Sequence, residues 1–322
     1  GLLRNLFGHQ VEEDLLHDNW TRMLGTPTPF VGGVNNTTYY IRWNSFWGRS
    51  YNNVMAPSAQ VIKQADEGGY DVFSAWAKLM QVLSISKTTA YHGPVIYSNY
   101  GVSGQANIYD KESDLYNKFF ADLDAVQAVF AANQSYAGLK KFDASYSGNM
   151  EKWSKLVNSM RLKLAIRISK VDPTLAKTQG EKAMSDAAGL ISSNGDNFRV
   201  SLYGGKLPMN VIAFEWGDTR MGSGMESFGV GMKDNRIASY FAPVADASLV
   251  SDHPDWPYKG IHSGAYLDAK DQRLPFSTPN ESFKVQESRR YFTYSEVCHL
   301  KAEAALRGWA GAGDAKTNYE DG

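Results

Sequence analysis

Apolar side chains recur at helical spacing over most of the first 190 residues and again near the end of the chain. A first stripe lies between residues 37 and 67, and a second runs from Val72 to the Gly93-Pro94 pair, with Gly68 and Gly69 between them. The spacing predicts a helical hairpin whose first helix has an aromatic face, made of Tyr40, Trp43, Trp47, Tyr51 and Val54.

The same periodicity predicts a second helix pair and further helices after it. Apolar residues return every three or four positions over residues 115–130 and again in "NMEKWSKLVNSMRLKLAIRISK", which starts at Asn149. Asp172-Pro173 is typical of a helix start, because Asp caps the N-terminus and Pro fits the first turn. Helix returns around residues 290–309, and another helix begins near Asp314.

Helical periodicity is lost between residues 191 and 290, where Gly, Pro, Asn and Asp separate short segments, some of them candidate strands. Successive helix pairs are typical of a solenoid of the tetratricopeptide kind, although the period here is degenerate. We therefore expect a mostly α fold in a single domain over residues 1–322. Its helical scaffold would cover about 1–190 and 291–322, and an irregular, aromatic-rich insertion would cover 191–290.

The composition of the chain limits the kinds of partner that it can bind. The chain has 322 residues, 43% of them hydrophobic, and 33 Lys and Arg against 34 Asp and Glu, which argues against a broad phosphate-binding face and so against nucleic acid. The single cysteine, Cys298, excludes an internal disulfide and is expected to be buried. No segment reaches the roughly 18 to 20 apolar residues that cross a bilayer. The six histidines lack metal-ligand spacing, so no metal or other cofactor is expected.

Three short patterns carry little chemistry. Ser84 and Lys87 form an S-x-x-K match without the later motifs of penicillin-recognising enzymes. Glu215 and Asp218 could serve as the two carboxylates of a glycosidase, but their spacing in a loop fixes no distance between them. The lysines that follow Asn149 could contact a membrane surface, yet the opposite face is an ordinary core stripe, so a solvated face is the better interpretation.

Aromatic residues outside the helices are the stronger signal. Tryptophan and tyrosine rings offer flat apolar faces to the C–H faces of sugars, and nearby Asp and Arg can bond the hydroxyls. At least one ring of the insertion is expected to be exposed, with Asp218, Arg220 or Asp255 beside it. The candidate ligand-binding residues are Trp216, Trp256, Tyr258, Tyr266, Asp218 and Arg220, with Tyr97 and Tyr100 as a second location.

Four stretches follow one another along the chain: "YYIRWNSFWGRSYNNV", "AWAKLMQVLSISKTTAYHGPVIYSNY", "YSGNMEKWSKLVNSMRLKLAIRIS" and "EVCHLKAEAALRGW". In this order they resemble motifs of the SusD/RagB-like outer-membrane nutrient-binding lipoproteins of the Bacteroidetes. In the third, Met160 and Lys163 depart from the family pattern. The resemblance covers residues 6–322 and implies a right-handed, tetratricopeptide-like scaffold, in which the stretch after Asn149 faces the core with Trp153 and the solvent with its lysines.

The resemblance also implies a location and a partner. Family members carry an N-terminal lipid anchor and further C-terminal helices, so we expect a chain shortened at both ends relative to the family. The preferred function is non-catalytic capture of a glycan at the cell surface and delivery to a SusC-like TonB-dependent transporter in the outer membrane. The alternatives are a helical scaffold that only contacts the transporter, and a glycoside hydrolase.

Overall fold

The computed structural model describes residues 1–7, 17–26, 46–102, 108–265 and 269–322, and the chain groups into two compact units. The first, here called the helical unit, contains Gly1–Phe7, Trp47–Ser201 and Arg290–Gly322. The second, here called the loop unit, contains Leu202–Arg289 and the described part of Gly8–Phe46. The described residues before Phe46 thus group with the irregular insertion rather than with the helices.

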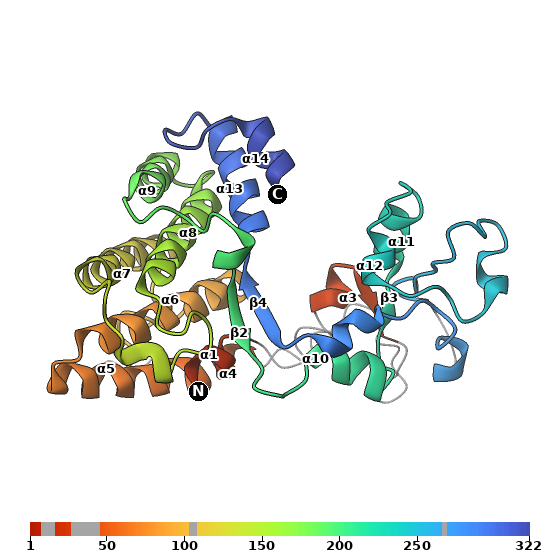
Figure 1. Cartoon of the computed structure of the whole chain (residues 1–322), viewed down its shortest axis with the longest axis horizontal. Coiled ribbons are helices and arrows are strands. Elements are labelled where there is room, and N and C mark those ends of the chain that lie inside the picture. Colours follow the sequence, from red (N-terminus) through yellow and green to blue (C-terminus); the bar gives the residue numbers. More distant parts are fainter. Residues whose placement is uncertain (8–16, 27–45, 103–107, 266–268) are drawn as a thin grey trace. The chain divides into compact units, whose positions relative to one another are not determined.

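The helical unit is built from consecutive helices that pack on one another in chain order, α5 on α6, α6 on α7, α7 on α8 and α8 on α9 (Figure 1). Its α-helices are α1 (Leu2–Asn5), α4 (Phe46–Arg49), α5 (Ala56–Gly68), α6 (Asp71–His92), α7 (Glu112–Ala132), α8 (Met150–Ile168), α9 (Pro173–Ser185), α13 (Tyr294–Leu306) and α14 (Ala315–Asp321). A π-helix, η2 (Ser50–Met55), joins α4 to α5, and 3-10 turns lie at η3 (Gly138–Lys141) and η4 (Asn194–Asp196). Late in the chain, α13 returns to pack on α8.

The loop unit contains short elements around a small core. They are α3 (Asp18–Trp20), α10 (Pro208–Asn210), π-helix η5 (Val211–Glu215), α11 (Ser223–Gly229), α12 (Ile237–Tyr240), and 3-10 turns η6 (Ala247–Val250), η7 (Lys270–Gln272) and η8 (Glu281–Val285). Strand β1 (Leu24–Gly25) pairs antiparallel with β3 (Arg220–Met221). Strands β2 (Phe198–Ser201) and β4 (Ser288–Phe292) form the other two-stranded sheet, whose buried Phe198 and Phe292 belong to the core of the helical unit.

The predicted helix starts and stops are largely confirmed. Asp172 caps α9 by accepting a hydrogen bond from the Leu175 amide at 2.9 Å, and Pro173 occupies the first turn. Asp314 caps α14 in the same way. Gly69, with a φ of 70°, ends α5 in the left-handed conformation that glycine adopts without strain. The first aromatic helix differs, because its described part begins at Phe46 and passes through a π-turn; residues 37–45 lie outside the described chain.

Burial follows the predicted helical stripes of α6, α7 and α8. Trp76 and Trp153 are buried, and so is Cys298. Trp47 and Tyr51 of the first stripe are half-buried and pack against this core. Trp43 lies outside the described residues.

Trp153 is the largest fully buried side chain of the described residues, and its position determines how α8 begins. Its ring packs edge-on against Trp76 and Tyr146, at 6.0 and 5.0 Å between ring centroids. A buried indole N–H requires an acceptor, because an unpaired polar group costs about 1–3 kcal/mol in a protein interior. The Asp143 carboxylate accepts this hydrogen bond at 2.8 Å.

The same carboxylate organises the loop that leads into α8. Asp143 also accepts hydrogen bonds from the backbone amides of Ser145, Tyr146 and Gly148, at 2.8, 3.0 and 2.8 Å. One buried side chain therefore fixes both the turn before α8 and the orientation of the Trp153 ring.

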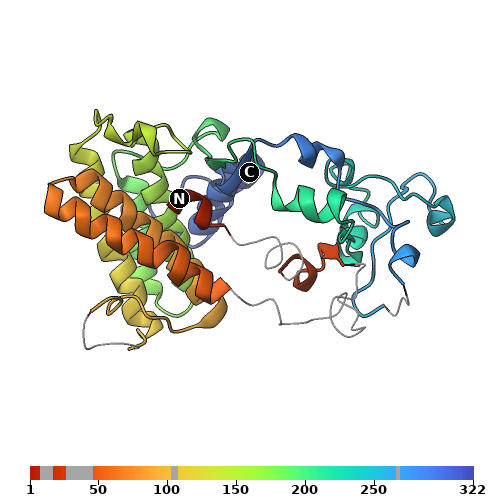
Figure 2. The ribbon, with the colours of Figure 1, turned by 90° about the horizontal axis from the view of Figure 1, so that it is seen from below.

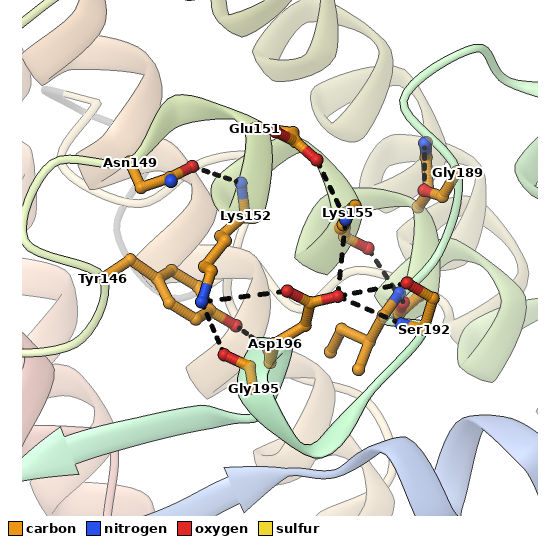
Figure 3. Close-up of polar contacts among 12 residues, drawn as sticks. Tyr146, Asn149, Glu151, Lys152, Lys155, Gly189, Ser192, Gly195 and Asp196 are labelled. Carbon is orange, nitrogen blue, oxygen red and sulfur yellow. Dashed lines mark hydrogen bonds and ion pairs between the residues drawn. The ribbon is translucent and has the colours of Figure 1, made fainter.

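The polar face of α8 binds the segment that follows α9. Asn158 donates to the Gly189 carbonyl at 3.0 Å, and the Ser159 hydroxyl accepts from the Ile191 amide at 2.9 Å. These are the central Asn and Ser of "KLVNSMRLKL", so this motif attaches the connection between α9 and β2 to the scaffold (Figure 3).

Asp196 lies where this connection meets the start of α8. Its carboxylate accepts from the Lys155 ammonium at 3.4 Å and from the Ser192 hydroxyl at 3.2 Å, while Lys152 donates to the Gly195 carbonyl at 2.5 Å (Figure 3). Lys163, about two turns further along α8, pairs with Glu296 of α13 at 2.7 Å. These three lysines are thus partly exposed and also bonded, because neighbouring segments supply carboxylate and carbonyl acceptors to them.

Burial alone would raise the pKa of Asp196, but the hydrogen bonds from Ser192 and Lys155 together hold that pKa below its ordinary value of 3.8. A carboxyl whose pKa is depressed by folding stabilises the fold above its unfolded pKa, and this contribution is lost as the pH falls through the folded pKa. The attachment of this segment to α8 should therefore weaken in acid.

Replacing Trp153 by Ala should lower the free energy of unfolding by about 3–5 kcal/mol, the usual range for removing a large aromatic ring from a core. Trp153→Phe keeps most of the volume but removes the donor to Asp143, and should cost about 1–2 kcal/mol. Urea unfolding followed by circular dichroism measures both. A loss below about 1 kcal/mol in Trp153→Ala would mean that this ring does not hold the helices together.

Asp196→Asn should lower the free energy of unfolding by about 1–2 kcal/mol at pH 7, because the amide cannot pair with Lys155 as an ion does. The difference should shrink as the pH falls from 3.8, the pKa of an ordinary Asp, through the lower pKa of the folded carboxyl, because the parent carboxyl then also becomes neutral. Glu151→Gln is the matched control, since Glu151 pairs with the same lysine from an exposed position. Equal stability of Asp196→Asn and the parent at pH 7 would show that the ion pair contributes nothing.

Candidate functional site

Aromatic rings gather in the helical unit where α4 and η2 meet the end of α6. Trp47 lies 5.1 Å from Tyr51 and 5.4 Å from His92 between ring centroids, and 5.8 Å from Tyr109 with the two planes only 29° apart. Tyr100 continues the group, 5.7 Å from Tyr51. We call these five residues the Trp47 cluster.

Within the Trp47 cluster, Tyr51 is held by hydrogen bonds and Tyr109 is exposed. The Tyr51 hydroxyl both donates to the Ile96 carbonyl, at 2.9 Å, and accepts from the Ile96 amide, at 2.8 Å, which fastens the segment after α6 to η2. Tyr109, in contrast, is 54% exposed, while Trp47 and Tyr100 are half-buried. The open face of the cluster is therefore mainly that of Tyr109, which lies in the segment between α6 and α7.

Burial also sets the protonation of the cluster. Burial raises the pKa of Tyr51 to about 12 and lowers the pKa of His92 below its ordinary 6.5. Both side chains are neutral at pH 7, so the cluster presents uncharged rings. Asn52, on the π-helix next to Tyr51, is exposed and brings an amide to the same element. Single π-turns within helices are frequent at functional sites.

Tyr97 and Tyr100, the second location from the sequence analysis, have different environments. The Tyr97 ring is buried against Phe119, and its hydroxyl donates to Asp122 at 2.8 Å. Burial, with the Asp122 charge next in size, raises the pKa of Tyr97 well above its usual value. Tyr97 thus supports the segment, while Tyr100 belongs to the Trp47 cluster.

In the loop unit, Trp216 follows the π-helix η5 and is 47% exposed, as the sequence analysis expects of at least one ring of the insertion. Lys270 holds this turn by donating to the Trp216 carbonyl at 2.6 Å and to the Asp218 carboxylate at 2.7 Å. Glu215 is ion-paired with Lys206. Trp216 therefore stands on a turn that ion pairs keep in shape.

The other insertion candidates are less open. Asp218 and Arg220 are buried, and Arg220 donates to the carbonyls of Leu274 and Thr219, at 3.2 and 2.7 Å. Tyr258 is buried in the core of the loop unit and Trp256 packs half-buried against that core. Tyr266 lies outside the described residues.

The loop unit also contains a cavity of about 770 Å³, lined mainly by methionine and aromatic side chains. The lining includes Met209, Met225, Phe228 and Phe283, and Asp18 lies at its wall. Burial raises the pKa of Asp18 to about 6. An apolar lining of this kind differs from the tryptophan and tyrosine faces that suit sugars.

The described residues contain no group of three or more His, Cys, Asp or Glu side chains suited to a metal ion. Among the same residues, no helix has the length and apolar character needed to span a bilayer.

Comparison with known proteins places the chain in a family. The SusD-like family, described as "Susd and RagB outer membrane lipoprotein", matches residues 4–322. The chain belongs to this SusD-like family.

Solved structures agree with this assignment. A chitin-binding SusD homologue from Flavobacterium johnsoniae is 33% identical, with a TM-score of 0.89 over 99% of this chain and 67% of that one. A SusD homologue from Bacteroides vulgatus is 29% identical, with a TM-score of 0.85 over 97% and 63%. A third structure, described as a chitin-binding protein, is 26% identical, with a TM-score of 0.80 over 97% and 69%.

These matches confirm the SusD-like resemblance and the mostly helical, tetratricopeptide-like scaffold. The chain spans about two thirds of the length of the three solved proteins. The search of curated proteins found no match.

The sequence analysis missed Trp47 and Tyr109 as candidate site residues. Trp47 continues a helical stripe, and a ring at such a position cannot be told from a core ring by spacing alone. Tyr109 carried the signal that selected the insertion aromatics, a tyrosine among loop residues next to an aspartate.

Proposed function

We propose that this SusD-like protein captures a glycan at the surface of the outer membrane, without cleaving it, and delivers it to a SusC-like TonB-dependent transporter. The observation that carries the proposal is the Trp47 cluster, whose rings are partly exposed where α4 and η2 meet the end of α6. Two similar structures described as chitin-binding support a saccharide ligand. The family description as outer-membrane lipoproteins supports the location.

In this proposal Trp47, Tyr109 and Tyr100 stack on sugar rings, and Asn52 bonds hydroxyls. Trp216 is a further candidate contact in the loop unit, with Asp218 positioning its turn through Lys270. A few contacts on an open surface give weak monovalent affinity, with a dissociation constant of about 10 µM to 1 mM, or roughly 4 to 7 kcal/mol. Repeated sugar units and the transporter's own contacts would strengthen retention in the cell.

A hydrolase is disfavoured by the carboxylates themselves. Glu215 is ion-paired with Lys206, and the buried Asp218 with Lys270. A glycosidase needs two carboxylates that face one open subsite, one of them protonated as the acid. Neither side chain is presented in that way here.

We expect parent protein to bind chitin oligosaccharides in isothermal titration calorimetry, because of the two chitin-binding structures. Tyr109→Ala should weaken binding at least about tenfold by removing an exposed stacking face, and Trp47→Ala should abolish it. Tyr109→Phe, which keeps the ring, should bind nearly as the parent does. Tyr319→Ala removes an exposed tyrosine from α14 and should change nothing.

Circular dichroism checks that each variant is folded. An affinity gel with assorted polysaccharides extends the test to other glycans, and a pure scaffold would migrate unretarded in all of them. Trp216→Ala and Trp256→Ala test the insertion by the same assays. Binding that survives in folded Tyr109→Ala and Trp47→Ala but disappears in Trp216→Ala would move the site to the loop unit.

Delivery is tested separately, by co-purification of the protein with a SusC-like transporter co-expressed with it. Recovery of the complex supports delivery. If no complex is recovered under conditions where the protein still binds the glycan, the delivery part of the proposal is wrong and glycan capture alone remains.

A further inference from the structure

A second group of aromatic rings lies at the opposite end of the α5–α6 hairpin from the Trp47 cluster. Phe73 packs edge-on against Tyr70 at 6.5 Å, against Tyr136 at 6.3 Å and against Phe142 at 5.5 Å between ring centroids. Tyr70 is 58% exposed and Phe142 is 63% exposed. We call these four residues the Phe73 cluster.

Two glycines allow these rings to lie directly on the backbone. A Cβ at Gly68 would come within 2.7 Å of the Tyr70 ring, and a Cβ at Gly138 would collide with the Tyr136 phenol. Neither glycine has a φ in the left-handed region, so close approach of a ring, not backbone freedom, is what glycine permits at both positions. The two phenols are thus held against bare main chain, which preorganises them for contact on the outer side.

A polar cavity of about 670 Å³ adjoins the rings, and Tyr136 belongs to both features. Its lining includes Gln134, Lys140, Ser147 and Glu151. Rings with open faces beside hydroxyl, amide and charged groups match the two chemistries of a sugar, whose C–H faces are apolar and whose hydroxyls form hydrogen bonds.

The two clusters lie at opposite ends of α6. Phe73 lies near the start of α6 and His92 at its end, so α6 separates these two rings by roughly 28 Å at a rise of 1.5 Å per residue. Figure 2 shows the α5–α6 hairpin in orange, with its two helices side by side. The exposed rings of the clusters, Tyr109, Tyr70 and Phe142, lie in the segments next to these helices. A chain of sugars long enough to reach both would bind more tightly than one that reaches either alone.

We propose that the Phe73 cluster and its cavity form a second glycan contact of the helical unit, which engages a distant part of the same polysaccharide chain. This inference rests on the proposed function. A protein partner is the other occupant of exposed aromatic rings, but an anchor for a protein is expected to have an apolar pocket beside it, whereas this cavity is polar.

The test compares polymer with short oligosaccharide in three proteins. Tyr70→Ala/Phe142→Ala should lower the apparent affinity for soluble polymeric glycan in gel retardation by about tenfold, because one of two linked contacts is lost. Its affinity for a disaccharide or trisaccharide at the Trp47 cluster, measured by calorimetry, should match the parent. Tyr319→Ala is the matched surface control.

Gly68→Ala distinguishes ring position from ring loss. It keeps every aromatic residue and replaces a helical glycine by a better helix former, but it pushes the Tyr70 ring off the backbone. We expect unchanged or raised thermal stability together with a polymer affinity between those of the parent and the double variant.

The outcomes separate the two proposals. If the parent binds no glycan, both the proposed function and the second glycan contact are wrong. If the parent binds but folded Tyr70→Ala/Phe142→Ala retains parental polymer affinity, only the second contact is wrong. Loss of polymer and short-oligosaccharide binding together would also contradict two separate contacts.

Discussion

The burial of Trp153 with its indole N–H bonded to Asp143 is the constraint on which the helical unit depends. The ring fills the space between α6 and α8, and the Asp143 carboxylate in the same interior accepts the hydrogen bond from its indole N–H. Burying a carboxylate costs free energy, and hydrogen bonds from three backbone amides of the preceding loop offset that cost. The packing of the core, the conformation of the loop and the start of α8 are consequently coupled through Asp143. A change in one of them is expected to alter the other two.

The opposite face of α8 extends this order to later parts of the chain. Asn158 and Ser159 hold the connection after α9, the Lys155–Asp196 pair holds its end, and Lys163 reaches α13. The motif that looks like a basic surface helix is therefore a helix with two bonded faces. Because the scaffold is fixed in this way, the two proposed ring contacts at the ends of α6 would need little reorganisation on binding a glycan.

The helices could be predicted because their signals are local. Apolar spacing, Asp172 with Pro173, and Gly69 each act within a turn or two, and α6, α8, α9 and α14 appear where those signals place them. The Lys155–Asp196 pair could not be predicted, since these residues lie 41 positions apart and no local pattern joins them. The candidate site was predictable only as a class of residue. Composition selected exposed tryptophan and tyrosine correctly for Trp216, but tertiary packing decides that Tyr97 and Tyr258 are buried and that Trp47, on a helical stripe, is not fully covered.

The most direct test follows the indole N–H signals of the eight tryptophans by NMR during titration with chitin oligosaccharide. Each indole reports its own surroundings, so one experiment separates surface contact from change in the core. The account predicts that the Trp47 signal moves and saturates, while those of Trp76 and Trp153 stay in place, because the glycan stacks on exposed rings of a scaffold that is already ordered. A shift confined to Trp216, or shifts of the core indoles as large as that of Trp47, would contradict it.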